Sequence, residues 1–171
     1  MIKHDQKIHP YDVPHISEQY GLKMNIVFRK ATFEDAELLF NWRNEKHDRL
    51  NSYNSDLIKF DAHCQWLNNL ITDSNREQLI ALLDGIPVGT LRIDSRHNPA
   101  ELAWSIDSNK RNKGIGKIML KTFFEYRHGI YRAEIKSNNI ASRKIAEYTG
   151  MSLIKIKNNI CYYIYNNTLN S

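Results

Sequence analysis

Hydrophobic residues along the chain follow two different periods, which predict a mixture of strands and helices. Short apolar or alternating runs bounded by turn residues predict strands at 25–30, 79–83, 88–93, 101–107, 131–136, 152–156 and 160–165. Apolar residues at helical spacing predict helices at 32–44, 61–71, 114–128 and 139–148. Asp84-Gly85 and Asn158-Asn159 join neighbouring strands as hairpins, whereas the strand–helix–strand unit at 101–136 requires parallel pairing with a right-handed crossover. These elements predict an α/β domain with a mixed sheet.

Composition narrows the class of protein. The 171 residues are 42% hydrophobic and 11% aromatic, which excludes a disordered chain. No run approaches the ~18 apolar residues of a membrane helix, and the N-terminus lacks the apolar core of a signal peptide. We therefore expect a cytoplasmic protein with an extension at 1–24 and one domain at 25–171. Cys64 and Cys161 form no disulfide framework or metal-ligand pattern, so no metal is expected.

The positive charge is concentrated in one segment that also carries glycines. The chain has 24 basic and 19 acidic residues, and four of the basic ones lie within 110–117 with no acid among them. Arg111 to Gly116 lie between a predicted strand and a predicted helix, where free backbone N–H groups and the positive end of the helix dipole hold anions. Glycines let the backbone approach such an anion closely. The segment predicts a pyrophosphate cradle, and a solvated basic turn is the alternative.

This segment resembles motif A of the GNAT superfamily of acyl-CoA N-acyltransferases, in which Arg or Gln, Gly, and Gly or Ala occupy fixed places; here these are Arg111, Gly114 and Gly116. Residues 100–104 (AELAW) resemble the family's fourth strand. Asn139, Ser142 and the following Ala-Glu and Gly-Met pairs resemble its motif B, in the style of the RimJ/RimL-like branch. The resemblance implies a mostly antiparallel sheet of about seven strands, flanked by about four helices, with a splay between two parallel central strands.

The resemblance also implies acetyl-CoA as co-substrate and a set of residues that bind it. Backbone amides from 112 to 117 would hold the pyrophosphate, the backbone at 105–107 would pair with the pantetheine, and the motif B side chains would face the pantetheine arm. The residues implied in acetyl-CoA binding are Ser105, Ile106, Asp107, Arg111, Asn112, Lys113, Gly114, Ile115, Gly116, Lys117, Asn139 and Ser142.

Direct attack of an amine on the thioester needs a base, because an amine is mostly protonated at pH 7. Glu101 is the predicted base, since members of the superfamily often place a Glu on this strand; a solvated strand-start carboxylate is the alternative. The residue that would protonate the leaving thiolate is not assigned. Many relatives carry a Tyr where this chain has Ala146, and Tyr148 lies roughly 200° further around the helix.

The two helices after the first strand normally select the acceptor in this family. Trp42 and Arg43 end the first of these helices, and His63 with Trp66 lies on the second. This pattern is similar to acetyltransferases that act on amino-sugar nucleotides, with His63 as a second candidate base; core packing and ordinary ion pairs are the alternatives. A protein N-terminal acetyltransferase and a basic module that binds nucleic acid or free CoA are the competing functions. A small-molecule amine is the expected partner, without nucleic acid or membrane, for a monomer or homodimer.

Overall fold

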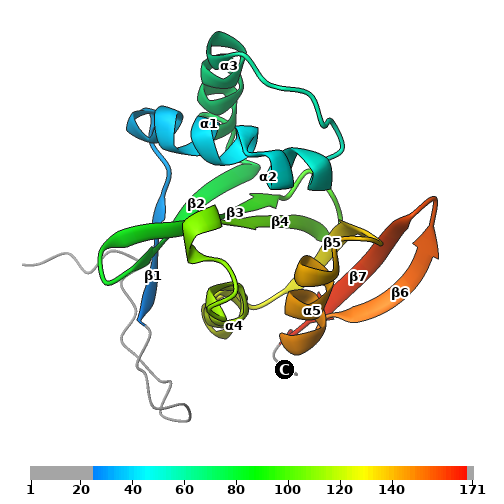
Figure 1. Ribbon diagram of the computed structural model, residues 1–171. Helices are drawn as coiled ribbons and strands as arrows, with labels where there is room; N and C mark the ends of the chain where they lie inside the picture. The colour runs from blue at the N-terminus through cyan, green and yellow to red at the C-terminus, as the bar shows by residue number, and fades with distance from the viewer. Residues whose placement is uncertain (1–24, 169–171) are drawn as a thin grey trace, which may run out of the picture.

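A single seven-stranded sheet runs through the molecule (Figure 1). The computed structural model describes residues 25–168, so the predicted extension at 1–24 lies outside the described residues. The strands lie in the order β1-β2-β3-β4-β5-β7-β6. Their bounds are Ile26–Lys30 (β1), Arg76–Leu83 (β2), Ile86–Asp94 (β3), Ala100–Ile106 (β4), Ile130–Lys136 (β5), Ser152–Lys157 (β6) and Ile160–Asn166 (β7).

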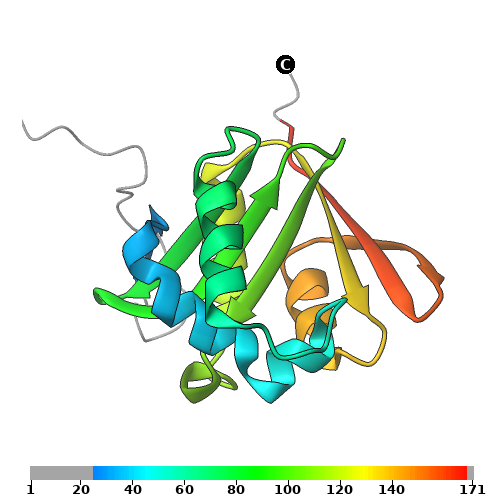
Figure 2. The ribbon, with the colours of Figure 1, turned by 90° about the horizontal axis from the view of Figure 1, so that it is seen from above.

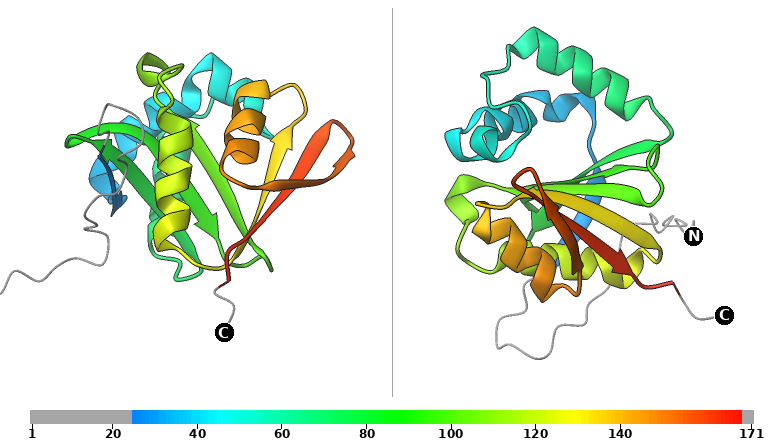
Figure 3. Two further views of the ribbon diagram at one scale, coloured as in Figure 1. Left: turned by 90° about the horizontal axis from the view of Figure 1, so that it is seen from below. Right: turned by 90° about the vertical axis from the view of Figure 1, so that its right-hand side faces the viewer.

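Helices cover both faces of this sheet. Figure 3 shows α1, α2 and α3 on one face and α4 and α5 on the other. Their bounds are Ala36–Asn44 (α1), Lys46–Asn51 (α2), Phe60–Ile71 (α3), Ile115–Tyr126 (α4) and Ile140–Tyr148 (α5), with short 3-10 turns at Phe33–Asp35 and Ser108–Lys110. The apolar stripes of α3 and α4 are buried against opposite faces, at Leu67 and Leu70 for α3 and at Met119, Leu120 and Phe123 for α4. The sheet is therefore the middle layer of three.

The only parallel strand pair of the described sheet opens into a splay, as the resemblance implied. β4 and β5 pair in register only at Ala100 with Tyr131 and at Glu101 with Arg132. Every other neighbouring pair is antiparallel. Beyond Glu101 the two strands diverge, and Figure 2 shows the V-shaped gap between them. One edge of β4 from 102 to 106 is consequently free of strand pairing.

The turn chemistry read from the sequence is present. Asp84 and Gly85 both have positive φ, as do Asn158 and Asn159, and Gly150 ends α5 with φ 91°. One helix was not predicted: α2 has no buried residue, so its sequence KHDRLN lacks the apolar period that marks a helix. The sheet consequently carries five α-helices among the described residues, one more than the sequence pattern indicated.

Candidate active site

The loop before α4 presents a run of free backbone N–H groups. Gly114 is the N-cap of α4 with φ 77°, and Asn112 has φ 62°, so the chain turns twice through the left-handed region. None of the N–H groups from 112 to 116 donates to another described residue. Successive N–H groups of this kind at a helix N-terminus form an anion-binding concavity. The geometry fits a pyrophosphate group on backbone alone.

A cleft of about 390 Å³ runs from this loop along the open edge of β4 to the start of α5, and we call it the donor cleft. Every residue that the resemblance implied in acetyl-CoA binding lines the donor cleft, except Asp107 and Lys113. Asp107 instead accepts a hydrogen bond from the Asn109 N–H at 3.0 Å and caps the short turn after β4. Close packing of α4 against α5 explains why residue 116 is a glycine, because a Cβ there would lie 2.5 Å from Ile145 Cδ1.

The Arg111 side chain does not face solvent as a free anion ligand. Its Nη2 lies 2.9 Å from Asp48 Oδ2 and 3.4 Å from Glu45 Oε2, and its Nε donates to the Ile106 carbonyl at 3.0 Å. Glu45, at the N-cap of α2, and Asp48, on α2, thus neutralise the charge of Arg111. Arg111 lines the donor cleft and also links α2 to the end of β4 through these contacts.

Asn139 and Ser142 lie together at the N-terminus of α5. Asn139 is the N-cap, and its side-chain oxygen accepts the Ser142 N–H at 3.1 Å. Ala146, at the place where many relatives carry Tyr, is fully buried. Tyr148 is exposed, with the Lys117 ammonium 4.4 Å from its ring centroid. Asn139 and Ser142 thus bring an amide and a hydroxyl group to the lining of the donor cleft, and such groups can polarise a thioester by hydrogen bonding.

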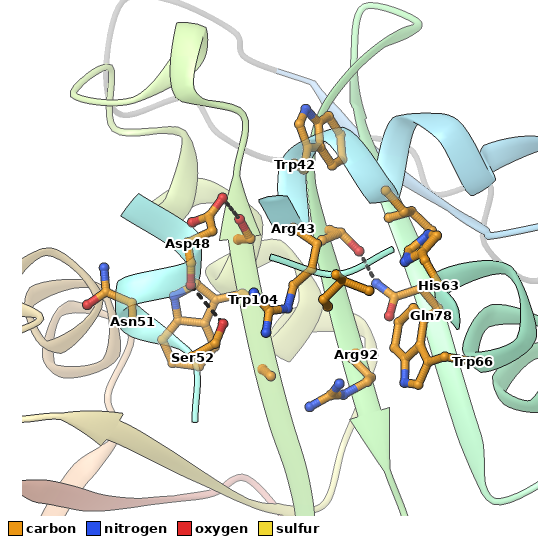
Figure 4. A pocket seen from close by; sticks show the side chains of 15 residues that line it. Trp42, Arg43, Asp48, Asn51, Ser52, His63, Trp66, Gln78, Arg92 and Trp104 are labelled. Carbon is orange, nitrogen blue, oxygen red and sulfur yellow. Dashed lines mark hydrogen bonds between the residues drawn. The ribbon is translucent and has the colours of Figure 1, made fainter. Parts of the chain in front are cut away.

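A second cavity, of about 370 Å³, lies on the other face of the sheet beneath α1, α2 and α3, and we call it the acceptor cavity. Strand register places its floor, because Gln78 faces Arg92 across β2 and β3, and Thr90 faces Ser105 across β3 and β4. Gln78 donates to the Thr90 hydroxyl, which in turn donates to the Leu79 carbonyl at 2.8 Å. Figure 4 shows the Arg43 and Arg92 side chains reaching into one space between Trp66 and Trp104.

Two guanidinium groups dominate the electrostatics of the acceptor cavity. Arg43 donates through Nη2 to the Asn54 carbonyl at 2.8 Å, while its buried Nη1 has no hydrogen-bond partner. The Arg92 guanidinium forms no hydrogen bond or ion pair with another described residue, although the charges of Glu101 and Asp94 act to raise its pKa. Burial lowers the pKa of both arginines, because desolvation disfavours the charged form. An anionic group entering the cavity would supply the partners that these cations lack.

The predicted acceptor-side residues all reach this cavity. Trp42 is buried against the cluster that holds Leu39 and Leu67, and it lines the cavity wall. His63 is 2% exposed, packs between Phe40 and Trp66, and leaves its Nε2 without a partner. Burial lowers the His63 pKa, opposed by a backbone hydrogen bond with Ala36. The imidazole is therefore neutral near pH 7.

Glu101 lies in a third cavity, of about 290 Å³, between β4 and β5. Its carboxylate lies 2.8 Å from Arg132 Nη2, its register partner, and 3.9 Å from His97 Nε2. Glu134 in the same cavity accepts from the Tyr53 hydroxyl and lies 3.8 Å from Arg132. The third cavity shares Arg43, Arg92 and Trp104 with the acceptor cavity, so the two adjoin. The predicted base thus lies on the acceptor side, in an ion pair.

Sequence reasoning missed Asp48 and Arg92. Asp48 lies on the unpredicted helix α2, in a polar segment without any pattern that marks chemistry. Arg92 carried a usable signal, because it is a charged residue within a strand of the central sheet, between Leu91 and Ile93, which are both buried. A charge at such a position is costly unless it meets a partner.

Comparisons with known proteins agree with this geometry. Residues 25–152 match the family model described as the acetyltransferase (GNAT) domain. The chain belongs to the GNAT acetyltransferase family. A search of curated proteins found no match. Among solved structures, spermidine N-acetyltransferase from Vibrio cholerae, in complex with CoA and spermine, has a TM-score of 0.72 at 13% identity over 82% of this chain and 94% of that one.

Two further structures extend the comparison. A domain from Methanocaldococcus jannaschii has a TM-score of 0.71 at 26% identity, over 84% of this chain and 99% of that one. The ribosomal-protein-alanine N-acetyltransferase from Brucella melitensis has a TM-score of 0.66 at 23% identity, over 82% and 99%. This GNAT acetyltransferase is therefore an acyl-CoA-dependent N-acetyltransferase with acetyl-CoA as co-substrate. Residues 25–168 contain no cluster of potential metal ligands, and none of their helices meets the length and apolarity needed to cross a bilayer.

Proposed function

We propose that this GNAT acetyltransferase acetylates the primary amine of an anionic small molecule, such as an amino-sugar nucleotide. Acetyl-CoA would occupy the donor cleft and the amine the acceptor cavity, so that both are bound when the amine attacks the thioester. The observation that carries the proposal is the pair of guanidinium groups, Arg43 and Arg92, in a cavity that offers them no carboxylate within ion-pair distance.

The walls of the cavity suit a sugar linked to a phosphate. Trp66 and Trp104 present aromatic surface, and the buried Trp104 Nε1 has no hydrogen-bond partner among the described residues. Planar guanidinium groups bind phosphate oxygens in bidentate geometry. Charge-assisted hydrogen bonds of this kind contribute about 1.5–3 kcal/mol each. The adjoining third cavity adds room for the remainder of an extended acceptor.

The reaction requires the amine nitrogen to lose a proton, and Glu101 and His63 are the residues predicted to accept it. His63 brings a neutral imidazole with a free Nε2 into the acceptor cavity. Glu101 brings a carboxylate that Arg132 already binds at 2.8 Å. Both line the acceptor side, and neither lines the donor cleft.

The same charges argue against the competing acceptors. The Vibrio cholerae relative is named for a polyamine, a polycation that two unpaired arginines would repel. The Brucella melitensis relative is named for a ribosomal protein, and a basic N-terminal peptide would need an acidic groove. Asp48 is the only carboxylate that lines the acceptor cavity among the described residues. A non-enzymatic basic module is no longer an alternative, because the chain belongs to an acetyltransferase family.

A panel assay of thiol release from acetyl-CoA tests the proposal. The panel pairs nucleotide-linked amino sugars with the same amino sugars without phosphate, and adds polyamines, aminoglycosides and short peptides. We expect kcat/KM for the nucleotide-linked amine to exceed that of its phosphate-free partner by at least about tenfold, the equivalent of ~1.4 kcal/mol. Preference for a polyamine or a peptide N-terminus would overturn the anionic acceptor and leave the acetyltransferase assignment in place.

A further inference from the structure

Three residues line both the donor cleft and the acceptor cavity, and only one of them ionises. The shared residues are Asp48, Trp104 and Ser105. An amine held in one cavity and a thioester held in the other meet at the lining they share. Asp48 comes from α2, which lies over the end of β4, and its carboxylate accepts the Ser105 hydroxyl at 3.0 Å.

We infer that Asp48 is a catalytic residue of this reaction and accepts the proton that the attacking amine releases. The inference rests on the proposed two-cavity arrangement, although not on the anionic character of the acceptor. The amine enters as an ammonium ion and gives one proton to an Asp48 oxygen, which leaves a neutral nitrogen to attack the acetyl carbonyl carbon. The C–S bond breaks with its electron pair on sulfur, and a second proton from the nitrogen converts the thiolate to a thiol. Asp48 then returns the first proton to solvent, so the products are an amide, coenzyme A and one proton.

The two carboxylate oxygens of Asp48 have different surroundings. Oδ2 accepts from Ser105 and lies 2.9 Å from Arg111 Nη2. Oδ1 has only the His47 ring, at 3.5 Å, as a neighbour in ion-pair range. Bonds to Oδ2 therefore fix the orientation of the carboxylate, and Oδ1 is left to accept from an incoming amine. This is the arrangement expected of a base whose second oxygen is held by the protein.

Several charged groups face Asp48, and together they set its affinity for a proton. Arg111 approaches from the loop before α4, His47 from α2 itself, and Arg43 from α1. Burial is the largest influence and raises the Asp48 pKa above its ordinary value, while the Arg111 charge opposes that rise. A carboxylate with a raised pKa is a stronger base than one in water.

The third cavity offers a competing meeting point. It shares Trp104, Asn139 and Ser142 with the donor cleft, and its carboxylates are Glu101 and Glu134. Both of these carboxylates are engaged, Glu101 by Arg132 and Glu134 by the Tyr53 hydroxyl. Neither carboxylate lines the acceptor cavity, although Arg43 and Arg92 line the third cavity as well. Asp48 is bound in the same way by Arg111 and Ser105, so it is favoured because it alone of the three carboxylates lines both the donor cleft and the acceptor cavity. The comparison of variants decides between them.

The test compares Asp48→Asn with Glu45→Gln and Glu101→Gln, using the full chain and whichever panel amine is acetylated. Glu45 is the matched control, because it also pairs with Arg111, at 3.4 Å, but lines none of the three cavities. In Asp48→Asn the side-chain oxygen can still accept hydrogen bonds from Ser105 and Arg111, so α2 should keep its position. Thermal unfolding and acetyl-CoA binding by calorimetry check that it does, and Asp48→Glu restores a carboxylate.

We expect Asp48→Asn to lower kcat by about 100-fold or more at pH 7 with KM for acetyl-CoA changed by less than about threefold. The loss should shrink as the pH approaches the pKa of the free amine, and Asp48→Glu should recover part of it. Glu45→Gln should stay within about threefold of wild type at every pH. A wild-type pH profile in Asp48→Asn, or the full loss appearing in Glu101→Gln instead, would overturn the assignment.

Failure of the proposed function would look different. If a cationic or neutral amine is acetylated, the acceptor class is wrong and the Asp48 comparison runs unchanged on that amine. If no amine is acetylated, a carbon-13 titration of the Asp48 carboxyl, assigned with Asp48→Asn, decides the point. Titration above the ordinary aspartate pKa of about 3.9 supports a buried base, and titration at or below that value overturns it.

Discussion

The donor cleft and the acceptor cavity meet at Asp48, Trp104 and Ser105, yet they are built from different parts of the polypeptide. The donor cleft offers backbone: the N–H groups from 112 to 116 and the open edge of β4. The acceptor cavity offers side chains from six elements, which are α1, α2, α3, β2, β3 and β4. A site made of backbone tolerates many substitutions but few changes of conformation, whereas a site made of side chains has the opposite sensitivity.

Gly114→Pro should give the largest effect, because it changes the backbone conformation of the donor cleft. Proline requires φ near −65°, Gly114 has φ 77°, and the substitution also removes one of the free N–H groups. We expect acetyl-CoA affinity to fall by about 100-fold or more, measured by calorimetry and by the loss of thermal stabilisation with acetyl-CoA.

Gly85→Pro is the matched control for this variant. Gly85 has φ 79° in the hairpin turn between β2 and β3, so proline meets the same conflict away from the cleft. Both variants should lose stability by roughly 3 kcal/mol, and only Gly114→Pro should lose acetyl-CoA. Equal loss of acetyl-CoA in the two variants would show that stability, and not the cradle, controls binding.

Arg92→Met should have the next largest effect, and it removes a charged side chain from the acceptor cavity. Loss of one charge-assisted contact should raise KM for the anionic acceptor by about ten- to hundredfold, and higher ionic strength should weaken the wild-type preference. At the same time the variant should unfold at a higher temperature, because a half-buried charge without an ion pair is replaced by an apolar side chain. Binding and stability should therefore change in opposite directions.

Arg96→Met provides the same change of charge outside the cavity. The Arg96 guanidinium lies 2.5 Å from Asp94 Oδ2, just beyond the end of β3, and is half exposed. It should leave the acceptor KM unchanged and lower stability only slightly, because solvent screens an exposed ion pair. If Arg92→Met left KM unchanged as well, the acceptor would not be held by its charge.

The contrast between a donor cleft built of backbone and an acceptor cavity built of side chains also explains how much of the site could be predicted from the sequence. The cradle occupies contiguous positions, so the glycines at 114 and 116 and the basic residues around them marked it directly. The seven strands were predictable for a similar reason, since each depends on a local period and on turn pairs such as Asp84-Gly85. Local features of the chain determine both.

The acceptor cavity could be predicted only in part. Trp42, Arg43 and His63 were found because a family pattern marks them, but Arg92 reaches the same space through the register of β2 with β3. Asp48 depends on α2, a short helix that no hydrophobic period predicts. Even Arg111, which lines the donor cleft, has partners that the sequence did not suggest, because Glu45 and Asp48 lie more than sixty residues away.

The smallest expected effect concerns His63 and separates the two sites by their response to pH. Burial depresses the His63 pKa, so below the unfolded value of about 6.5 the unfolded chain binds a proton that the native chain resists. The stability that this group contributes is therefore present above that pH and is lost as the pH falls. His63→Gln removes the titrating group while keeping a side chain of similar size.

Urea unfolding at pH 7.5 and pH 5 measures the free energy of unfolding at both values. We expect wild type to lose more stability over this interval than His63→Gln does, by on the order of 1 kcal/mol. His128→Gln is the control, because His128 is exposed after the end of α4, and it should keep the wild-type difference. An unchanged difference in His63→Gln would mean that the imidazole meets solvent or an anion in the folded protein. The acceptor cavity would then be more open than its packing against Phe40 and Trp66 indicates.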